Sequence, residues 1–399
     1  MRHALIRSGL MGVVAVGAVA AQAGMAGAAT SARPMAGPAR VFVSEHGKHG
    51  AKDTSCSSAA FTSVTAAAAV VRTGGNVVVC AGRYHQDVAV TRRVNVDGRP
   101  GAVINASGKI NGVLVHASRA AVSGLKVVNA TGEGILVVSS NHVTIENNVV
   151  THNDLGGQPN PVKTSYAECK TVGNTPGDCG EGIHLMGSSF ATVRDNVSSG
   201  NTGGILLSDE TGPTAHNHIV GNVVTNNLFD CGITVASHSP KGFVKGHVVP
   251  NAGGVYANLI TRNRISGNGI KGAGAGVVLA TGVPGGAVYD NTVSRNAISG
   301  NGMAGVTLHS HTPGQDLNGN VIFRNQFGIN NLRGDSDFGP HHADKRTTGV
   351  LVGSVTPLSI RVADNLIVGD HFGIWTTGPV TLHHSNNKFI KVTVHLAKG

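Results

Sequence analysis

The motif Gly-Ile-His-Leu at residues 182–185 returns as Gly-Ile-Leu-Leu at 204–207 and as Gly-Ile-Thr-Val at 232–235. The same type of motif, Gly-[Ile/Val]-x-[Leu/Val/Thr], begins at Gly112, Gly134, Gly182, Gly204, Gly232, Gly276, Gly305, Gly349 and Gly373. The shortest spacings between these glycines are 22 and 24 residues. A period of this length is typical of a solenoid, in which each repeat forms one coil.

A second motif, Asn-x-[Ile/Val]-x-x-Asn, lies between these repeats at residues 217–222, 258–263 and 291–296, and 320–325 is close to it. Its second Asn has counterparts at Asn148, Asn196, Asn365 and Asn387. Two alternating strand types joined by turns such as Ser-Gly-Asn-Gly (266–269 and 299–302) predict an all-β fold, a right-handed parallel β-helix. Coils then stack at about 4.8 Å, and the repeated Asn side chains form hydrogen-bonded ladders.

The same stacking predicts which side chains form the core. Because side chains alternate along a strand, the second residue of each Gly-[Ile/Val] motif should face the interior. We therefore expect one interior row made of Ile135, Ile183, Ile205, Ile233, Val277, Val306, Val350 and Ile374.

The N-terminus has the features of an export signal. Arg2 and Arg7 precede an apolar stretch at 10–21, and Ala-x-Ala sites follow at 21–23 and 26–28. The sequence predicts a signal peptide at 1–28, a flexible leader at 29–40 and one β-helix domain at 41–399. Residues 58–72 are the one helical stretch before the repeats, and we expect them to cap the first coil.

Charge and cysteines bear on location and partner. Removing residues 1–28 lowers the net charge from +10 to +8, which favours an anionic partner, although general solubility is an alternative explanation. We expect a secreted, extracellular monomer without a membrane anchor, whose partner is an acidic polysaccharide and not a nucleic acid. Cysteines of exported proteins often pair, and chain order suggests Cys56–Cys80 and Cys169–Cys179, with Cys231 buried.

The first coils resemble a known superfamily. The run Val64 to Ala69, the segment Gly-Gly-Asn-Val-Val-Val-Cys-Ala-Gly-Arg-Tyr at 74–84, and Val-Ala-Val at 88–90 resemble the opening of pectin-lyase-like β-helix proteins. With the repeats, this resemblance covers residues 41–396. It implies the fold but leaves function open, since the superfamily contains lyases, hydrolases, esterases, epimerases, binders and copper-site accessory proteins.

Breaks in a uniform ladder are the places to look for chemistry. The outward positions and following turns of adjacent coils carry His184, Asp209, Glu210 and His238, within roughly 10 Å by the stacking distance. A carboxylate beside an imidazole can orient it for proton transfer. We interpret His238 as a base and His184 as an acid, in a groove bordered by residues 155–180. We expect these residues at exposed turns, where the alternative is a solvated turn without function.

Two other groups are candidate substrate contacts. His309 and His311 follow two coils later, and Arg262, Arg295 and Arg324 precede ladder Asn residues on a different face. Such a row of guanidinium groups suggests a track for an acidic glycan, unless Asp290 and Asp316 neutralise it.

Metal binding is a further possibility. Asp335 and Asp337, or Asp209 with Glu210, could hold calcium. Closely spaced His pairs at 216 and 218, 309 and 311, 341 and 342, and 383 and 384 could bind copper or zinc, but no ligand set can be assigned from the sequence.

The sequence favours an enzyme that acts on an acidic polysaccharide by β-elimination or C5 epimerisation, both of which begin with proton abstraction next to a carboxylate. Several signatures within the superfamily are absent, including Asp-Pro-His-Asp and Gly-His-Gly. The alternatives are a glycoside hydrolase using Asp209, Glu210 and Asp230, and a non-catalytic glycan-binding or metal-accessory protein.

Overall fold

The computed structural model describes residues 37–154, 180–238, 243–244, 247–248, 253–335 and 345–399. Gly37–Gly399 forms a compact unit by itself. The predicted signal peptide and most of the predicted leader lie outside the described residues, as do Cys169, Cys179 and Asp337.

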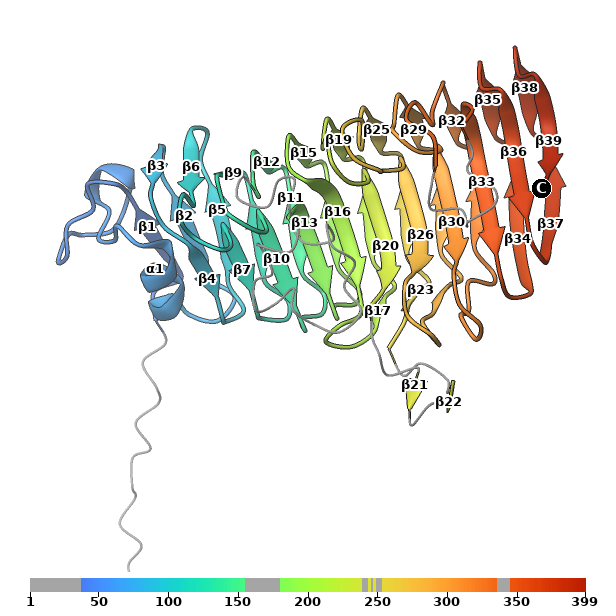
Figure 1. The fold of residues 1–399 in the computed structure, drawn as a ribbon. Helices are drawn as coiled ribbons and strands as arrows, with labels where there is room; N and C mark the ends of the chain where they lie inside the picture. Colours follow the sequence, from blue (N-terminus) through green and yellow to red (C-terminus); the bar gives the residue numbers. More distant parts are fainter. Residues whose placement is uncertain (1–36, 155–179, 239–242, 245–246, 249–252, 336–344) are drawn as a thin grey trace, which may run out of the picture. The chain divides into compact units, whose positions relative to one another are not determined.

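The described strands form three long parallel sheets, stacked in the order of the sequence (Figure 1). Sheet A has 12 strands: β1 (Arg40–Val43), β2 (Asn76–Val79), β5 (Asn95–Gly98), β8 (Ala121–Ser123), β11 (Thr144–Glu146), β14 (Thr192–Arg194), β18 (His218–Val220), β24 (Leu259–Thr261), β28 (Thr292–Ser294), β31 (Val321–Phe323), β34 (Leu358–Ala363) and β37 (Val380–Ser385). Sheet B has 11: β3 (Gly82–Tyr84), β6 (Ala102–Asn105), β9 (Lys126–Val128), β12 (Val149–Thr151), β15 (Val197–Ser199), β19 (Val223–Thr225), β25 (Arg264–Ser266), β29 (Ala297–Ser299), β32 (Gln326–Phe327), β35 (Leu366–Val368) and β38 (Lys388–Ile390). Sheet C also has 11: β4 (Val88–Val90), β7 (Val113–Val115), β10 (Ile135–Val138), β13 (Glu181–Met186), β16 (Gly203–Ser208), β20 (Ile233–Ser237), β26 (Val277–Thr281), β30 (Val306–Ser310), β33 (Thr348–Ser354), β36 (Phe372–Thr377) and β39 (Val394–Lys398).

Each coil contributes one strand to each sheet, so the all-β parallel solenoid is confirmed. The predicted interior row is confirmed as well. Successive members from Ile135 to Ile374 are paired residue by residue along sheet C, and every one is fully buried. The repeat therefore sets the register of sheet C.

Asparagine ladders run along three corners of the coils. At the turn from sheet A to sheet B, side-chain amides bond from coil to coil in the row Asn148, Asn196, Asn222, Asn263, Asn296, Asn325, Asn365 and Asn387. A second row, before sheet A, joins Asn217, Asn258, Asn291 and Asn320. A third row, which the sequence reasoning did not identify, follows sheet B and joins Asn153, Asn201, Asn227, Asn268, Asn301 and Asn330. All three rows supply buried hydrogen bonds at the corners of the solenoid.

The N-terminal segment differs from the prediction in its helix. The predicted helix at 58–72 is wrong in extent, because only α1 (Val64–Val70) and the short 3₁₀ helix η1 (Cys56–Ser58) form. Phe61 instead bridges to Val43 of β1, so the chain before Ser63 is extended. The Ser63 side chain accepts a hydrogen bond from the Ala66 amide and starts α1 there. α1 packs against β1, β2 and β4; its role as a cap stays a prediction.

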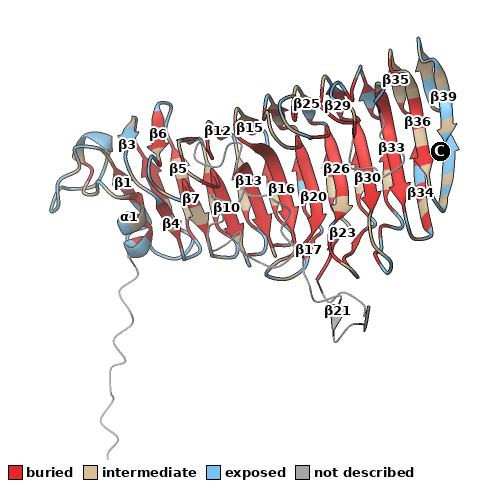
Figure 2. Ribbon diagram, in the orientation of Figure 1, coloured by how far each residue is buried: buried red, intermediate tan, exposed pale blue. Residues whose placement is uncertain are grey.

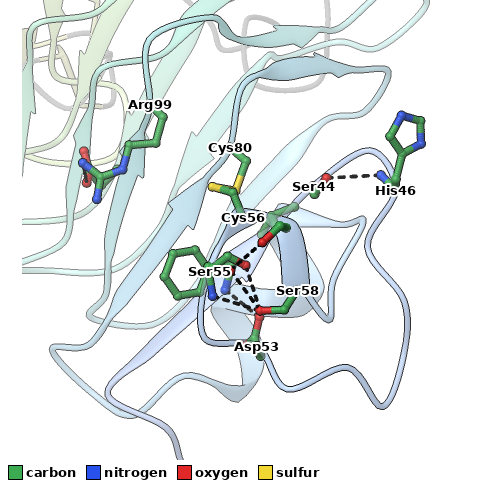
Figure 3. The surroundings of a disulfide bond; sticks show 12 residues. Ser44, His46, Asp53, Ser55, Cys56, Ser58, Cys80 and Arg99 are labelled. Atoms are coloured by element: carbon green, nitrogen blue, oxygen red, sulfur yellow. Dashed lines mark hydrogen bonds and ion pairs between the residues drawn. A yellow bond between two sulfur atoms is a disulfide. The ribbon is translucent and has the colours of Figure 1, made fainter.

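The disulfide between Cys56 and Cys80 is confirmed, with the two Cα atoms 5.7 Å apart (Figure 3). It ties η1 to the end of β2, beside the hydrogen bond that Ser55 donates to Ser58. Cys231 is buried, as expected, next to Ala275, Val278 and Met303.

Smaller elements lie at the turns. β17 (Thr214–Ala215), β23 (Val255–Tyr256) and β27 (Val288–Tyr289) form a short parallel sheet, and β21 (Phe243–Val244) pairs with β22 (His247–Val248) in antiparallel fashion.

Sheet C has an unusual distribution of burial: β13, β16 and β20 are buried on both faces (Figure 2). The outward positions of these strands are therefore enclosed.

Candidate functional site

The candidate site lies on the outer face of sheet C. Ile183 and Leu185 of β13 point into the core, so His184 between them points outward. Its neighbours in register are Leu136 and Leu206. A histidine between two leucines breaks the pattern of the face, and the polar residues around it explain how it is accommodated.

Glu133 holds one side of the imidazole. Glu133 Oε1 lies 2.9 Å from His184 Nδ1, and Glu133 Oε2 accepts a hydrogen bond of 3.0 Å from the Glu181 amide. His184 is fully buried, and Glu133 is 2% exposed. Such a buried carboxylate and imidazole are accommodated because each hydrogen-bonds the other.

Ser208 and Glu210 extend these contacts to the second histidine. His184 Nε2 lies 2.6 Å from Ser208 Oγ, and Ser208 Oγ donates a hydrogen bond to Glu210 Oε2. Glu210 Oε1 lies 2.8 Å from His238 Nδ1. Glu133, His184, Ser208, Glu210 and His238 thus form one hydrogen-bonded set, here called the buried polar network.

The direction of these bonds determines where the protons lie. Ser208 has one hydroxyl hydrogen and gives it to Glu210, so His184 Nε2 must donate to the Ser208 oxygen. His184 Nδ1 faces the Glu133 carboxylate and donates there. The geometry therefore suits a His184 that carries a hydrogen on both ring nitrogens and a Glu210 that accepts at both oxygens.

The ionisation of Glu210 agrees with this arrangement. Burial raises its pKa, but the hydrogen bond and charge of His238, the charge of His184 and the Ser208 hydrogen bond outweigh burial and lower the pKa to about 2. Glu210 is therefore ionised at neutral pH and holds the Nδ1 side of His238.

Asp209 has a different position from the one expected for a second site carboxylate. Its Oδ1 accepts the His238 amide at 2.8 Å, and its Oδ2 accepts Ser237 Oγ at 2.8 Å and the Gly254 amide at 2.7 Å. Asp209 thus supports the backbone that carries His238.

The expected exposure of these residues is wrong. His184 and Asp209 are 0% exposed and His238 is 1% exposed. Alternation along a strand distinguishes inside from outside of the coil, but β13, β16 and β20 are enclosed on both faces, so an outward side chain is not a solvated one. Substitutions here will consequently affect stability as well as chemistry. The groove wall predicted at 155–180 lies almost wholly outside the described residues.

His309 and His311 do not join the buried polar network. His309 lies on β30, in register with Ala280 and Gly353, and its Nε2 is 3.1 Å from Asp335 Oδ2. The His309 and His311 rings meet edge to face at 5.4 Å. Asp335 is thus engaged with an imidazole, and calcium binding by Asp335 and Asp337 stays a prediction.

Arg262, Arg295 and Arg324 lie at the turn from sheet A to sheet B, a different corner from the sheet C face that carries His184. Among the described residues the one ion pair of this row joins Arg324 to Asp364, at 3.9 Å, and no pair involves Asp290 or Asp316. The alternative, in which those two acids neutralise the row, is therefore not seen in the described part of the chain.

Three residues of the site escaped the sequence reasoning: Glu133, Glu181 and Ser208. Glu133 and Glu181 occupy matching places in two Gly-Glu-Gly segments, at 132–134 and 180–182, and this repeat could have identified them. Glu133 is bonded both to the backbone amide of Glu181 and to the His184 imidazole, both of which lie on the next coil.

Glu133, Glu181 and His184 also form a potential metal group, because one ligand atom from each lies within 4.8 Å of the others. Two carboxylates and one imidazole suit a divalent ion such as Cu²⁺ or Zn²⁺ better than Cu⁺, which prefers sulfur ligands. This donor set fits a divalent metal provided that His184 gives up the hydrogen that its Nδ1 donates to Glu133, since a metal ligand needs a free lone pair.

Comparison with known families adds a relationship. A family model described as "Periplasmic copper-binding protein (NosD)" matches residues 94–292 and 211–353, which together cover well over half of the chain. The chain belongs to the NosD family. Among curated proteins, no sequence is significantly similar to this NosD-family chain.

Solved structures share the fold at low identity. A GH136 lacto-N-biosidase from Eubacterium ramulus has 11% identity and a TM-score of 0.53, covering 90% of this chain and 68% of its own. PfbA, a surface adhesin of Streptococcus pneumoniae, has 12% identity and a TM-score of 0.52, covering 84% and 86%. A Yersinia enterocolitica family 28 exopolygalacturonase has 9% identity and a TM-score of 0.50, covering 90% and 78%. These likenesses, all well under 25% identical, show a shared parallel β-helix fold and nothing finer.

Within the described residues, no helix of this NosD-family chain has the length and hydrophobicity needed to cross a membrane.

Proposed function

We propose that this chain transfers a proton next to a carboxylate of an acidic polysaccharide, by β-elimination or C5 epimerisation. The observation that carries the proposal is the buried polar network, in which the ionised Glu210 holds His238 through Nδ1. A carboxylate in this position orients an imidazole and stabilises its protonated form. The disulfide and the periplasmic description of the family support a location outside the cytoplasm.

His238 is the catalytic base in this proposal. With Nδ1–H donated to Glu210, Nε2 is assigned in this proposal as the nitrogen that removes the proton on C5 of a uronate residue. In β-elimination the electron pair of that C–H bond becomes the C4–C5 double bond, the C4–O bond breaks, and the departing oxygen receives the proton. In epimerisation a proton returns to C5 from the opposite face.

His184 is a positioning residue, which revises its expected role as the acid. Both of its ring nitrogens are in hydrogen bonds, to Glu133 and Ser208, so neither is aimed at a substrate. Through its contact with Ser208 it belongs to the set of groups around Glu210, in which the His238 hydrogen bond and charge lower the pKa of that carboxylate most, followed by the charge of His184. Asp209 in turn positions His238 through the backbone.

The test is incubation of the purified protein with a panel of uronic-acid polysaccharides, following the absorbance of unsaturated ends together with reducing sugar and the C5 configuration by NMR. His238→Asn should lower the rate by about 100-fold, in the range of lost general base catalysis. His218→Asn, on the exposed side of β18, is the matched control and should keep the wild-type rate.

Because His238 is buried, thermal melting of each variant must accompany the assay. A folded His238→Asn protein with full activity would contradict the role of this residue. Absence of any product from the whole panel would contradict the reaction itself.

The family description and the Glu133, Glu181 and His184 group favour metal handling as a second candidate function. Copper bound there would be held as cargo by two carboxylates and an imidazole. Glu181→Gln should then abolish Cu²⁺ binding measured by calorimetry, while His218→Asn should not. Tight Cu²⁺ binding without turnover of any polysaccharide would favour this second function.

A further inference from the structure

One row of residues on the surface has a backbone conformation that its side chains do not favour. The residue before each ladder Asn at the turn from sheet A to sheet B has φ between 53° and 70° in the row Asn147, Asp195, Gly221, Arg262, Arg295, Arg324, Asp364 and Asn386. Gly124, which precedes Leu125 at the same turn one coil earlier, has φ 68° and makes this a row of nine positions. Glycine, Asn and Asp are the residues that tolerate this left-handed region. Six of the nine positions follow that rule, and three consecutive coils do not.

Arginine occupies those three coils at a cost in backbone energy. The φ angles are 57° at Arg262, 54° at Arg295 and 56° at Arg324. A Cβ in this conformation approaches the following carbonyl, and arginine has no short polar group to compensate. Because Asn147 and Asn386 occupy the same position, the backbone does not require arginine. The turn before sheet A also holds unfavourable residues in this conformation, such as Phe190 and Ala257, so the backbone alone does not single out the arginines. Their shared positive charge on three consecutive coils does, and it points to a role outside the fold.

The three guanidinium groups form a charged row along the coils. The amides of Arg262, Arg295 and Arg324 make equivalent bonds to the next coil, so these residues follow one another at about 4.8 Å. All three are exposed, and within the described ranges Arg324 is the one that pairs with an acid, Asp364. Like charges this close repel one another unless an anion lies along them.

Two more arginines widen this row. Arg264 is exposed at the start of β25, two residues after Arg262. The guanidinium of Arg361 on β34 lies 5.7 Å from the centre of the Phe323 ring, over which Arg324 lies at 4.6 Å. We call these five residues, Arg262, Arg264, Arg295, Arg324 and Arg361, the arginine strip. It runs just before the strands β25, β29 and β32 that are labelled along one edge in Figure 1.

We propose that the arginine strip binds a linear polysaccharide that carries carboxylates, with the polymer lying along the coils. Guanidinium forks bind carboxylates in a bidentate manner, and the coil spacing is close to the length of one sugar in an extended polymer. The strip is on the corner opposite sheet C, so it is a second, non-catalytic site. It does not depend on the acid–base role of His238.

The test uses the full chain with Arg262→Asn, Arg295→Asn and Arg324→Asn combined. Asn fits the left-handed backbone, so the charge is removed without new strain. Affinity for polygalacturonate and alginate is measured by calorimetry and affinity electrophoresis at two salt concentrations. Exposed ion pairs contribute little individually, so losing three should weaken binding about tenfold and reduce its salt dependence.

A charge-matched control separates the strip from net charge. Lys52→Gln, Arg83→Gln and Arg119→Asn together remove the same charge from exposed positions elsewhere and should change affinity by less than about twofold. His238→Asn should bind as the wild type does, which makes failure here distinct from failure of the proposed reaction.

Three results would overturn the inference. The first is equal affinity of the wild type and the triple arginine variant for both uronate polymers. The second is an equal loss in the charge-matched control. The third is equally tight binding of inorganic polyphosphate, because the strip would then recognise charge and not a carboxylated polysaccharide.

Discussion

The turn from sheet A to sheet B and the outer face of sheet C are built on opposite principles. At the turn, one residue type, Asn, repeats from Asn148 to Asn387, and each amide bonds its copy in the next coil. On the outer face of sheet C, equivalent positions carry different residues: Leu136, His184, Leu206, Thr234, Val278 and Thr307. Both regions are largely buried, so burial alone does not distinguish them.

The difference lies in where the hydrogen bonds of each polar group go. A ladder Asn is satisfied by the residue that the repeat itself places above or below it. His184 is satisfied by Glu133 and Ser208, which the repeat does not supply. Repetition therefore marks positions that hold the solenoid together, and a buried polar group outside the repeat marks a position retained for another purpose.

A substitution in the Asn ladder at the turn from sheet A to sheet B should have the largest effect on the free energy of unfolding. Asn222 accepts hydrogen bonds from the amide and Nδ2 of Asn196, and it donates to Asn263 Oδ1 and Val193 O. Asn222→Ala leaves these buried partners unsatisfied and should lower the free energy of unfolding by about 3 kcal/mol. Urea denaturation measures the change. Asn226→Gly, exposed and left-handed, is the control and should stay within about 0.5 kcal/mol.

Cutting the buried polar network at Ser208 should cost less stability and more activity. Ser208→Ala removes the hydroxyl between His184 and Glu210, so the charge of His184 acts less directly on the carboxylate. We expect the rate on the established substrate to fall by roughly 10- to 100-fold, with a shifted pH profile. Ser188→Ala, equally buried but bonded to backbone carbonyls, should keep the wild-type pH profile. Identical profiles for both variants would remove Ser208 from the proposed mechanism.

The contribution of Glu210 to stability should depend on pH. Its folded pKa of about 2 lies below the ordinary 4.5, so the ionised carboxylate stabilises the fold fully above about pH 4.5. That contribution is lost as the pH falls toward 2. The difference in unfolding free energy between the wild type and Glu210→Gln should therefore shrink over this interval, as measured by urea titrations from neutrality downward. A difference that is the same at every pH would show that Glu210 is not ionised by its neighbours.

The smallest effect on stability is expected in the arginine strip, where a substitution should stabilise the protein and not destabilise it. Arg295→Asn relieves an unfavourable left-handed arginine, so it should leave stability unchanged or raise it by up to about 1 kcal/mol. The reciprocal change, Asn147→Arg, should be destabilising by a similar amount. Thermal melting of the two variants measures both, and a loss of stability in Arg295→Asn would show that the arginine has a structural role.

The features of the fold that recur with the repeat could be predicted from the sequence. The row from Ile135 to Ile374, two of the three Asn ladders and the Cys56–Cys80 bond could each be predicted, because position within a 22-residue repeat or chain order determines them. The helix was placed too early, since Ala and Ser near residue 60 favour a helix locally while Phe61 is held by β1.

The candidate site could be predicted only in part. His184, Glu210 and His238 were found because they interrupt the repeat, and the structure connects them. Glu133 was missed because its partner His184 is 51 residues away, across an insertion that separates adjacent coils. Burial of the site was also beyond reach, since alternation along a strand does not show what covers the outside of a sheet.

The Asn ladders give the solenoid an electrical polarity. In each ladder the Oδ1 atom accepts from the preceding coil and the Nδ2 group donates to the following one, so the amide dipoles add along the stack. Their positive ends point toward the later coils. The ladder that begins at Asn153 reaches Asn330, where Asp370 takes the place of the next Asn: its Oδ1 accepts the backbone N–H of Asn330 at 2.9 Å, while Asn330 Nδ2 donates to the carbonyls of Ile298 and Gly328. The Asp370 carboxylate therefore lies at the positive end of a row of aligned amide dipoles. An anion is stabilised in the same way at the N-terminus of an α-helix, which is the positive end of the helix dipole.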